Sequence, residues 1–291
     1  MLCTADATYD LRQVSTSNTV FITQPINVSN DDDGPPTLEL RAIAQPQTTL
    51  EVLPTKIRSA TSHLSATLPA YTSTGHYSTS EAISKAQCFA SLPFSEAECE
   101  RSWTELACFE LSDGQHAVVP SAQVIILVWE VLLETATARG VDLTAPVNAH
   151  ALSDAGVDDN GWPQELSRAV LQSVAAEASK ANELQLDPQI CAKSVGRSTL
   201  KILSDEQRGP VSVSLFKSRW ADLLPEAWRH LANLTLLEGS YQLEPDASHL
   251  RYYERSGTDA SANGTTSTEA KSTLGAKRKW HEKFRASKKV S

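Results

Sequence analysis

The sequence lacks paired cysteines, a long apolar run and an N-terminal targeting pattern. Its five cysteines form no CxxC pair, which argues against a disulfide framework and a zinc ribbon and suits a reducing compartment. The most apolar run, residues 122–133, contains Glu130 and is shorter than the ~20 residues that a membrane-spanning helix needs. No basic and apolar leader follows Met1. We therefore expect no membrane partner.

Motifs that mark catalysis are also missing. The sequence contains no GxxxxGK[ST], GxGxxG, GxSxG or HExxH, and no two of its seven histidines stand four residues apart. The acidic segment 154–161 lacks acids at the alternate positions of a calcium loop, so it predicts an acidic turn. Cys99 and Cys108, at opposite ends of one predicted helix, are expected to be buried thiols. We expect a protein that is not an enzyme and holds no cofactor or metal.

Charge is distributed unevenly along the chain. The net charge is −9, yet residues 277–291 contain a single acid, Glu282, among seven lysines and arginines, so the remainder is more acidic still. An acidic body with a basic tail is typical of nucleic-acid contact or nuclear import, and a solvated terminus is the alternative. We expect a nuclear protein.

Residues 1–55 have the alternating pattern of β-strands. Residues 8–14 and 19–23 predict a strand pair joined by a polar turn at 15–18, followed by strands at 38–44 and 49–53. A sheet this small leaves open edges, so we expect a partner chain to complete it; a private core is the alternative. The candidates for partner binding are Tyr9, Leu11, Val20 and Ile22 for apolar contact and Asp10 and Asn18 at the turn.

From residue 78 the apolar pattern becomes helical, after a linker at 56–77 that could hold a short helix. Ser80 and Ser95 are candidate caps of helices at 80–90 and 96–109, and a long buried helix is predicted at 121–139. Further helices are predicted at 164–178, 187–203 and 212–224, with another starting at Pro225 and a hairpin at 241–253. The pattern predicts an α+β protein with winged helices at 78–140, 141–208 and 209–255, a flexible linker at 256–276 and a basic tail at 277–291.

Basic side chains follow the helices and the tail, and we predict that they bind DNA phosphates without reading bases. A solvated helix face is the alternative for the first three. The candidates are Lys193, Arg197, Lys201, Lys217, Arg219, Arg229, Lys277, Arg278, Lys279, Lys283 and Arg285. A scaffold that touches no DNA remains the main rival. A transcription regulator acting alone fits less well, because the helix at 96–109 carries four glutamates and one arginine.

Three segments resemble the Dcc family of sister-chromatid cohesion proteins. Cys3 and Thr8-Tyr9-Asp10-Leu11-Arg12, followed by Thr16-Ser17-Asn18, are similar to that family's strand–turn–strand signature. Phe216-x-x-x-Trp220 with Leu224-Pro225-Glu226, and Lys279-Trp280 near the end, agree with later segments in the same order. Family members have further strands before this signature, so we expect an N-terminally incomplete chain.

The resemblance implies a non-catalytic subunit of an alternative clamp-loader complex. It implies that the strands join a composite β-barrel with the large and small cohesion-specific clamp-loader subunits. It also implies that the winged helices contact DNA and the polymerase epsilon catalytic subunit. The complex would act on the PCNA clamp, which this chain meets indirectly, during DNA replication and sister chromatid cohesion.

Overall fold

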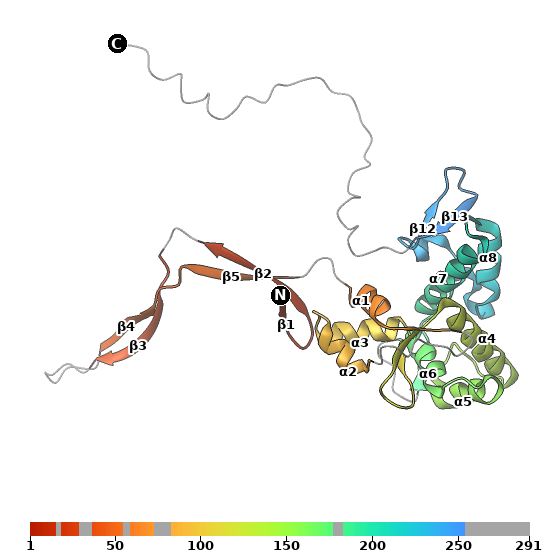
Figure 1. The fold of residues 1–291 in the computed structure, drawn as a ribbon, viewed down its shortest axis with the longest axis horizontal. Coiled ribbons are helices and arrows are strands. Elements are labelled where there is room, and N and C mark those ends of the chain that lie inside the picture. The colour runs from red at the N-terminus through yellow and green to blue at the C-terminus, as the bar shows by residue number, and fades with distance from the viewer. Residues whose placement is uncertain (16–18, 29–36, 55–58, 73–82, 177–182, 254–291) are drawn as a thin grey trace, which may run out of the picture. The chain divides into compact units, whose positions relative to one another are not determined.

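The computed structural model describes residues 1–15, 19–28, 37–54, 59–72, 83–176 and 183–253, and it is an α+β fold (Figure 1). Residues Met1–Gly257 form one compact unit. The predicted flexible linker 256–276 and basic tail 277–291 lie outside the described residues. The fold class predicted from the sequence is confirmed.

The N-terminal strands form two small antiparallel sheets. One sheet has the order β1-β2-β5 and the other contains β3 and β4. These strands are β1 Leu2–Cys3, β2 Thr8–Ser15, β3 Ile22–Val28, β4 Thr37–Ala44 and β5 Thr48–Pro54. The described strands close no barrel.

The predicted pairing of residues 8–14 with 19–23 is wrong. β2 pairs with β5 over seven positions, and the β3–β4 pair lies between them in the chain. The β2–β5 register places Leu11 opposite Val52 and Gln13 opposite Leu50, so apolar residues share a face. A nested arrangement of this kind depends on long-range pairing, which local alternation does not specify.

The first set combines three helices with a short sheet of strand order β6-β8-β7. It contains α1 Ala60–Thr67, β6 Ala70–Tyr71, α2 Lys85–Ser91, α3 Glu96–Glu105, β7 Phe109–Glu110 and β8 Ala117–Pro120. Thus the predicted linker at 56–77 holds a helix and a strand. Ser84 and Ser95 each form a capping box, with Gln87 and Glu98 respectively, which satisfies the free N–H groups at the helix starts. The helix predicted from Ser80 therefore begins later, at Lys85, and Ser80 itself lies outside the described residues.

The second set starts with a long, largely buried helix. It contains α4 Ala122–Ala138, β9 Val147–Asn148, α5 Ala149–Asn160, α6 Gln164–Ser173 and β10 Glu183–Leu184. The buried helix predicted at 121–139 is confirmed as α4, and Gly140 follows its end with a positive φ of 65°. The structure adds that Ser121 caps its start.

The acidic turn predicted at 154–161 is wrong, because α5 runs through most of it. The first turn of α5 is anchored by the buried side chains of Ala149 and Leu152, and the helix packs on α4 and α6. Tertiary packing therefore overrides the turn-forming composition of the acidic segment.

The third set repeats the order of the first set: a helix, a strand, further helices and a hairpin. It contains α7 Pro188–Gln207, β11 Val211–Ser212, α8 Val213–Asp222, η2 Glu226–Leu231, η3 Leu234–Leu237, β12 Tyr241–Leu243 and β13 His249–Tyr252. The helix predicted after Pro225 is wrong in type, because η2 and η3 are two short 3₁₀ helices. The predicted hairpin is confirmed as β12 and β13. Helix α4 begins the second set, and helix α7 begins the third.

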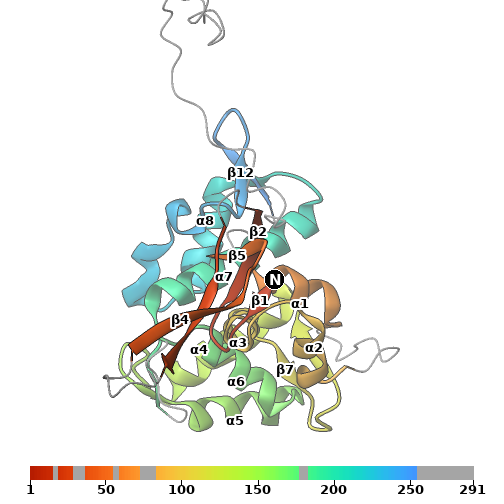
Figure 2. The same cartoon turned by 90° about the vertical axis from the view of Figure 1, so that its left-hand side faces the viewer.

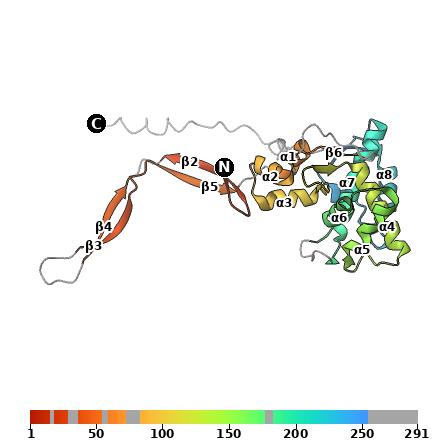
Figure 3. The ribbon, with the colours of Figure 1, turned by 60° about the horizontal axis from the view of Figure 1, so that its bottom comes forward.

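The main core joins the second and third sets. Figures 2 and 3 both show α4, α6 and α7 beside one another, and α4 packs against α7 and α6. The indole Nε1 of Trp129 donates to the carbonyl of Leu223 at 2.8 Å, and that of Trp220 donates to the carbonyl of Ala192 at 2.8 Å. Buried indoles therefore have their polar atoms satisfied and fix how the helices pack.

Candidate functional site

The β2–β5 ladder has one apolar and one polar face. The register places Tyr9 and Leu11 on the same face as Leu50 and Val52. The opposite face carries the Arg12–Glu51 pair of positions. Leu50 is 64% exposed, and no residue of β5 is buried. An amphipathic ladder normally buries its apolar face, so this surface has the character of an interface.

Strands β3 and β4 have further exposed apolar side chains. Leu40 is 70% exposed, and Ile22 and Ile43 are each more than half exposed. Within the described strands both β3 and β4 are edges, because the sheet contains only these two. Their unpaired N–H and C=O groups are available to another chain.

The six candidates for partner binding do not share one surface in the structure. Tyr9 and Leu11 share the apolar face of β2, and Val20 and Ile22 are exposed at and before the start of β3. Asp10 pairs with Leu53 inside β2, so its predicted place at a turn is wrong. Asn18 lies outside the described residues.

Sequence reasoning missed several exposed apolar side chains of β4 and β5. They are Leu40, Ile43, Leu50, Val52 and Leu53, all exposed. The alternation of apolar and polar residues in 48–54 carried the signal, but the face on which each side chain lies depends on the register with β2.

Hydrogen bonds between Thr8 and the residues Ser95 and Glu98, here called the Thr8 joint, connect the first sheet to α3. Thr8, which is 4% exposed, donates its hydroxyl to Glu98 Oε2 at 2.6 Å and accepts from the Ser95 N–H at 2.8 Å. The Ala97 N–H also donates to the carbonyl of Ala5 at 3.2 Å. Because Glu98 is the capping-box acid of α3, one carboxylate serves both the helix start and the strand.

Opposing effects act on the pKa of Glu98. Burial raises the pKa, but hydrogen bonds from Thr8 and Ser95 and the charge of Arg101 outweigh burial and hold it below its ordinary value. The carboxylate is therefore kept in the charged form that accepts these bonds.

The prediction of buried thiols is confirmed. Cys88, Cys99, Cys108 and Cys191 are free and buried, while Cys3 is free and exposed. Burial raises the pKa of Cys99 to about 11 and that of Cys108 to about 12, so neither thiol is ionised near neutral pH. These side chains behave as small apolar core residues.

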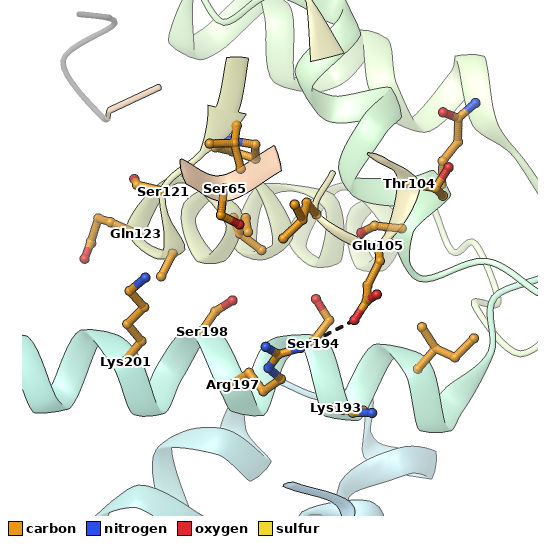
Figure 4. Close-up of a pocket in the computed structure, with 18 of the residues that line it drawn as sticks. Ser65, Thr104, Glu105, Ser121, Gln123, Lys193, Ser194, Arg197, Ser198 and Lys201 are labelled. Carbon is orange, nitrogen blue, oxygen red and sulfur yellow. Dashed lines mark ion pairs between the residues drawn. The ribbon is translucent and has the colours of Figure 1, made fainter. Parts of the chain in front are cut away.

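A deep groove lies between α3 and α7, with the end of β8 and the start of α4 at its base (Figure 4). Its volume is about 1390 Å³. Figure 4 shows Lys193, Arg197 and Lys201 along α7, and all three line the groove. The prediction that they share one helix face is therefore confirmed, although that face forms a wall of a groove.

Two of these cations already have partners. Arg197 lies 3.6 Å from Glu105 across the groove, and Lys201 Nζ lies 5.8 Å from the centre of the Tyr252 ring. Ile190, at the start of α7, is 40% exposed in the groove lining. The sequence marked the cations by their four-residue spacing, but it carried no sign of the aliphatic lining.

The remaining basic candidates lie elsewhere. Lys217 and Arg219 are on α8, Arg229 is on η2, and no ion pair joins them to a described carboxylate. The tail candidates lie outside the described residues: Lys277, Arg278, Lys279, Lys283 and Arg285.

The described part of the chain has neither a metal-binding cluster nor a membrane-spanning helix. No group of three His, Cys, Asp or Glu side chains there is arranged to hold a metal ion. None of its helices combines the length and apolar character required to cross a membrane.

Comparison with a family model agrees with the first two of the three segments that carry the resemblance, since the third, Lys279-Trp280, lies beyond the matched residues. No curated protein matches the chain. A family model, described as sister chromatid cohesion protein Dcc1, matches residues 1–257, which include every described strand and helix. The chain belongs to the Dcc1 family of sister chromatid cohesion proteins.

Proposed function

We propose that this chain is a non-catalytic subunit of an alternative clamp-loader complex that acts on the PCNA clamp. Family membership gives it a role in sister chromatid cohesion as part of a complex. The observation that carries the finer proposal is the uncovered apolar face of the β2–β5 ladder, formed by Tyr9, Leu11, Leu50 and Val52.

The strands bind partner strands by edge addition. Main-chain hydrogen bonds to an incoming strand satisfy the edge, and alternate side chains give specificity. The exposed apolar residues of β2, β4 and β5 supply the burial that a stable complex needs. The large and small cohesion-specific clamp-loader subunits are the proposed donors, and together with these strands they complete a β-barrel.

The helical sets face DNA and the polymerase epsilon catalytic subunit. Lys217, Arg219 and Arg229, on neighbouring elements of the third set, are suited to phosphate contact. The basic tail at 277–291 adds charge and directs the chain to the nucleus. ATP hydrolysis belongs to other subunits, in keeping with the absence of a GxxxxGK[ST] motif.

Co-expression tests the strand proposal. The full chain is produced with the two clamp-loader partners, in the form of the wild type, Leu11→Asp and Arg12→Ala. Leu11 lies on the apolar face and Arg12 on the polar face of the same strand, so the second variant is a matched control. We expect wild type and Arg12→Ala to co-purify with the partners and Leu11→Asp to lose them. Equal recovery of all three would exclude docking through the apolar face.

A gel-shift series tests the DNA proposal. Binding of a duplex is measured at several salt concentrations, with the full chain and with a chain lacking residues 277–291. Phosphate contacts release counterions, so affinity should fall linearly with salt on logarithmic axes, and the truncated chain should have a shallower slope. Affinity that did not change with salt would contradict the phosphate contacts.

A further inference from the structure

The groove between α3 and α7 has an aliphatic lining. Ile125, Ile190, Ile202, Val119 and Leu106 all line it and all remain partly or largely exposed. They come from α4, α7, β8 and the end of α3, so separate elements each contribute apolar side chains to the groove. Such a surface favours a ligand that has apolar side chains of its own.

The size of the groove suits a short helix. An α-helix about 10 Å across rises 5.4 Å per turn, so each turn fills roughly 420 Å³. The groove volume of about 1390 Å³ is several times that of one helical turn, so part of a helix can enter it. Its walls are themselves helices, and Figure 4 shows α7 running along one side.

The charges in the groove select an acidic ligand. On the α3 wall, Glu100 is paired with Lys85 at 2.8 Å, and Glu105 is engaged by Arg197. By contrast, Lys193 and Lys201 form no ion pair with any described carboxylate. Positive charge is left in a row on the α7 wall.

The remaining acids of the lining, Asp205 and Glu206, lie near the C-terminal end of α7. Lys193, Arg197 and Lys201 are four residues apart, which spans about two helical turns. Since Arg197 is engaged by Glu105, acids about two turns apart on a bound helix can meet Lys193 and Lys201.

Nucleic acid fits the groove less well. A single strand binds through aromatic side chains on which its bases stack, and Tyr252 is the sole aromatic residue of the groove lining. A duplex is read by a helix that enters its major groove. Here the basic face of α7 forms the wall of a groove instead.

We propose that the α3–α7 groove binds an acidic amphipathic helix of a partner protein. The apolar stripe of the helix contacts Ile125, Ile190 and Ile202, and its acidic flank pairs with Lys193 and Lys201. This assigns the basic row of α7 to a protein ligand, and DNA contact is left to α8, η2 and the tail.

A peptide probe tests the groove. The probe is a fluorescein-labelled 15-residue helix with leucines at i, i+4, i+7 and i+11 and glutamates beside them, and fluorescence anisotropy reports its binding to the full chain. A second peptide replaces every glutamate with lysine, and a third carries a central proline. We expect the acidic helix to bind at least tenfold more tightly than either. Equal binding of the acidic and basic peptides would overturn the proposal.

Two pairs of variants locate the site. Ile190→Gln should weaken binding of the acidic probe about tenfold, whereas Leu215→Gln, at a 43% exposed residue of α8 outside the lining, should not. Reversal of charge in Lys193→Glu/Lys201→Glu should abolish binding, whereas Lys193→Arg/Lys201→Arg should retain it. Unchanged affinity in both Ile190→Gln and the charge-reversed variant would refute the site.

Competition separates the protein ligand from nucleic acid. If a 15-nucleotide thymidine strand displaced the acidic helix and lost its own binding in the charge-reversed variant, the groove would be a nucleic-acid site and the proposal would fail. The gel-shift series is independent of this result, because Ile190→Gln leaves Lys217, Arg219 and Arg229 in place. The two proposals can therefore fail separately.

Discussion

At the residue scale, the close contact between α7 and Trp220 requires glycine at position 196. A Cβ added at Gly196 would lie 2.5 Å from Trp220 Cε2. Both residues are buried, and the indole is held by its hydrogen bond to Ala192. The helix α7 can approach α8 this closely because position 196 has no side chain.

We expect Gly196→Ala to lower the free energy of unfolding by about 1–3 kcal/mol, as overpacking of a core does. Chemical denaturation measures the change. Gly209→Ala is the matched control, since the atom nearest to its added Cβ is 3.7 Å away. Equal stability of the two variants would mean that Trp220 moves aside without cost.

The lowered pKa of Glu98 makes stability depend on pH. A carboxyl group whose pKa is lower in the folded chain stabilises the fold above its unfolded pKa, and that stabilisation is lost as pH falls through the folded value. We expect the stability advantage of wild type over Glu98→Gln to shrink as pH falls below the ordinary glutamate range, near 4.5. Denaturation midpoints between pH 7 and pH 3 measure it.

The exposed Glu96, one helix position away from the cap, provides the control. Glu96→Gln should keep the pH profile of wild type, because the bonds from Thr8 and Ser95 go to Glu98. A Glu98→Gln profile parallel to that of wild type would show that this carboxylate contributes nothing to acid sensitivity.

At the element scale, the Thr8 joint couples β2 to α3. Thr8→Val keeps the side-chain shape and removes the donor to Glu98, while the Ser95 N–H keeps Glu98 Oε2 as an acceptor at 3.1 Å. Loss of a hydrogen bond to a charged group costs about 1.5–3 kcal/mol. We expect faster amide hydrogen exchange at the start of β2 and of α3, with little change in α4 and α7.

The matched control is Thr49→Val. The Thr49 hydroxyl donates to the carbonyl of Val14 at 3.4 Å in an exposed position, where water can replace the bond. Exchange rates in Thr49→Val should equal those of wild type. If Thr8→Val also left them unchanged, the joint would not couple the sheet to the helix.

At the scale of the whole molecule, the buried core lies between Ala60 and Leu250. All the described residues that form it belong to the unit Met1–Gly257. We expect a chain that ends at Gly257 to unfold at the same temperature as the full chain, within about 1 °C, when followed by circular dichroism. A lower unfolding temperature would mean that the tail stabilises the fold.

Several elements could be predicted from local sequence because local physical rules determine them. Ser95 was identified as a cap because a hydroxyl before an apolar helical pattern satisfies the free N–H groups of that helix. Gly140 marked the end of α4, and the hairpin of β12 and β13 followed from two apolar runs around a polar turn. The four-residue spacing of Lys193, Arg197 and Lys201 placed them on one face.

The tertiary structure alone decided what these features do together. Whether β2 pairs with the next strand or with β5 depends on contacts between distant residues, and that choice sets which face holds Leu50 and Val52. Likewise, α7 turns its basic row toward α3 because its other face packs on α4 and Trp220. Periodicity specifies a face of a helix, but only the packing of neighbouring elements determines whether that face meets solvent or a groove.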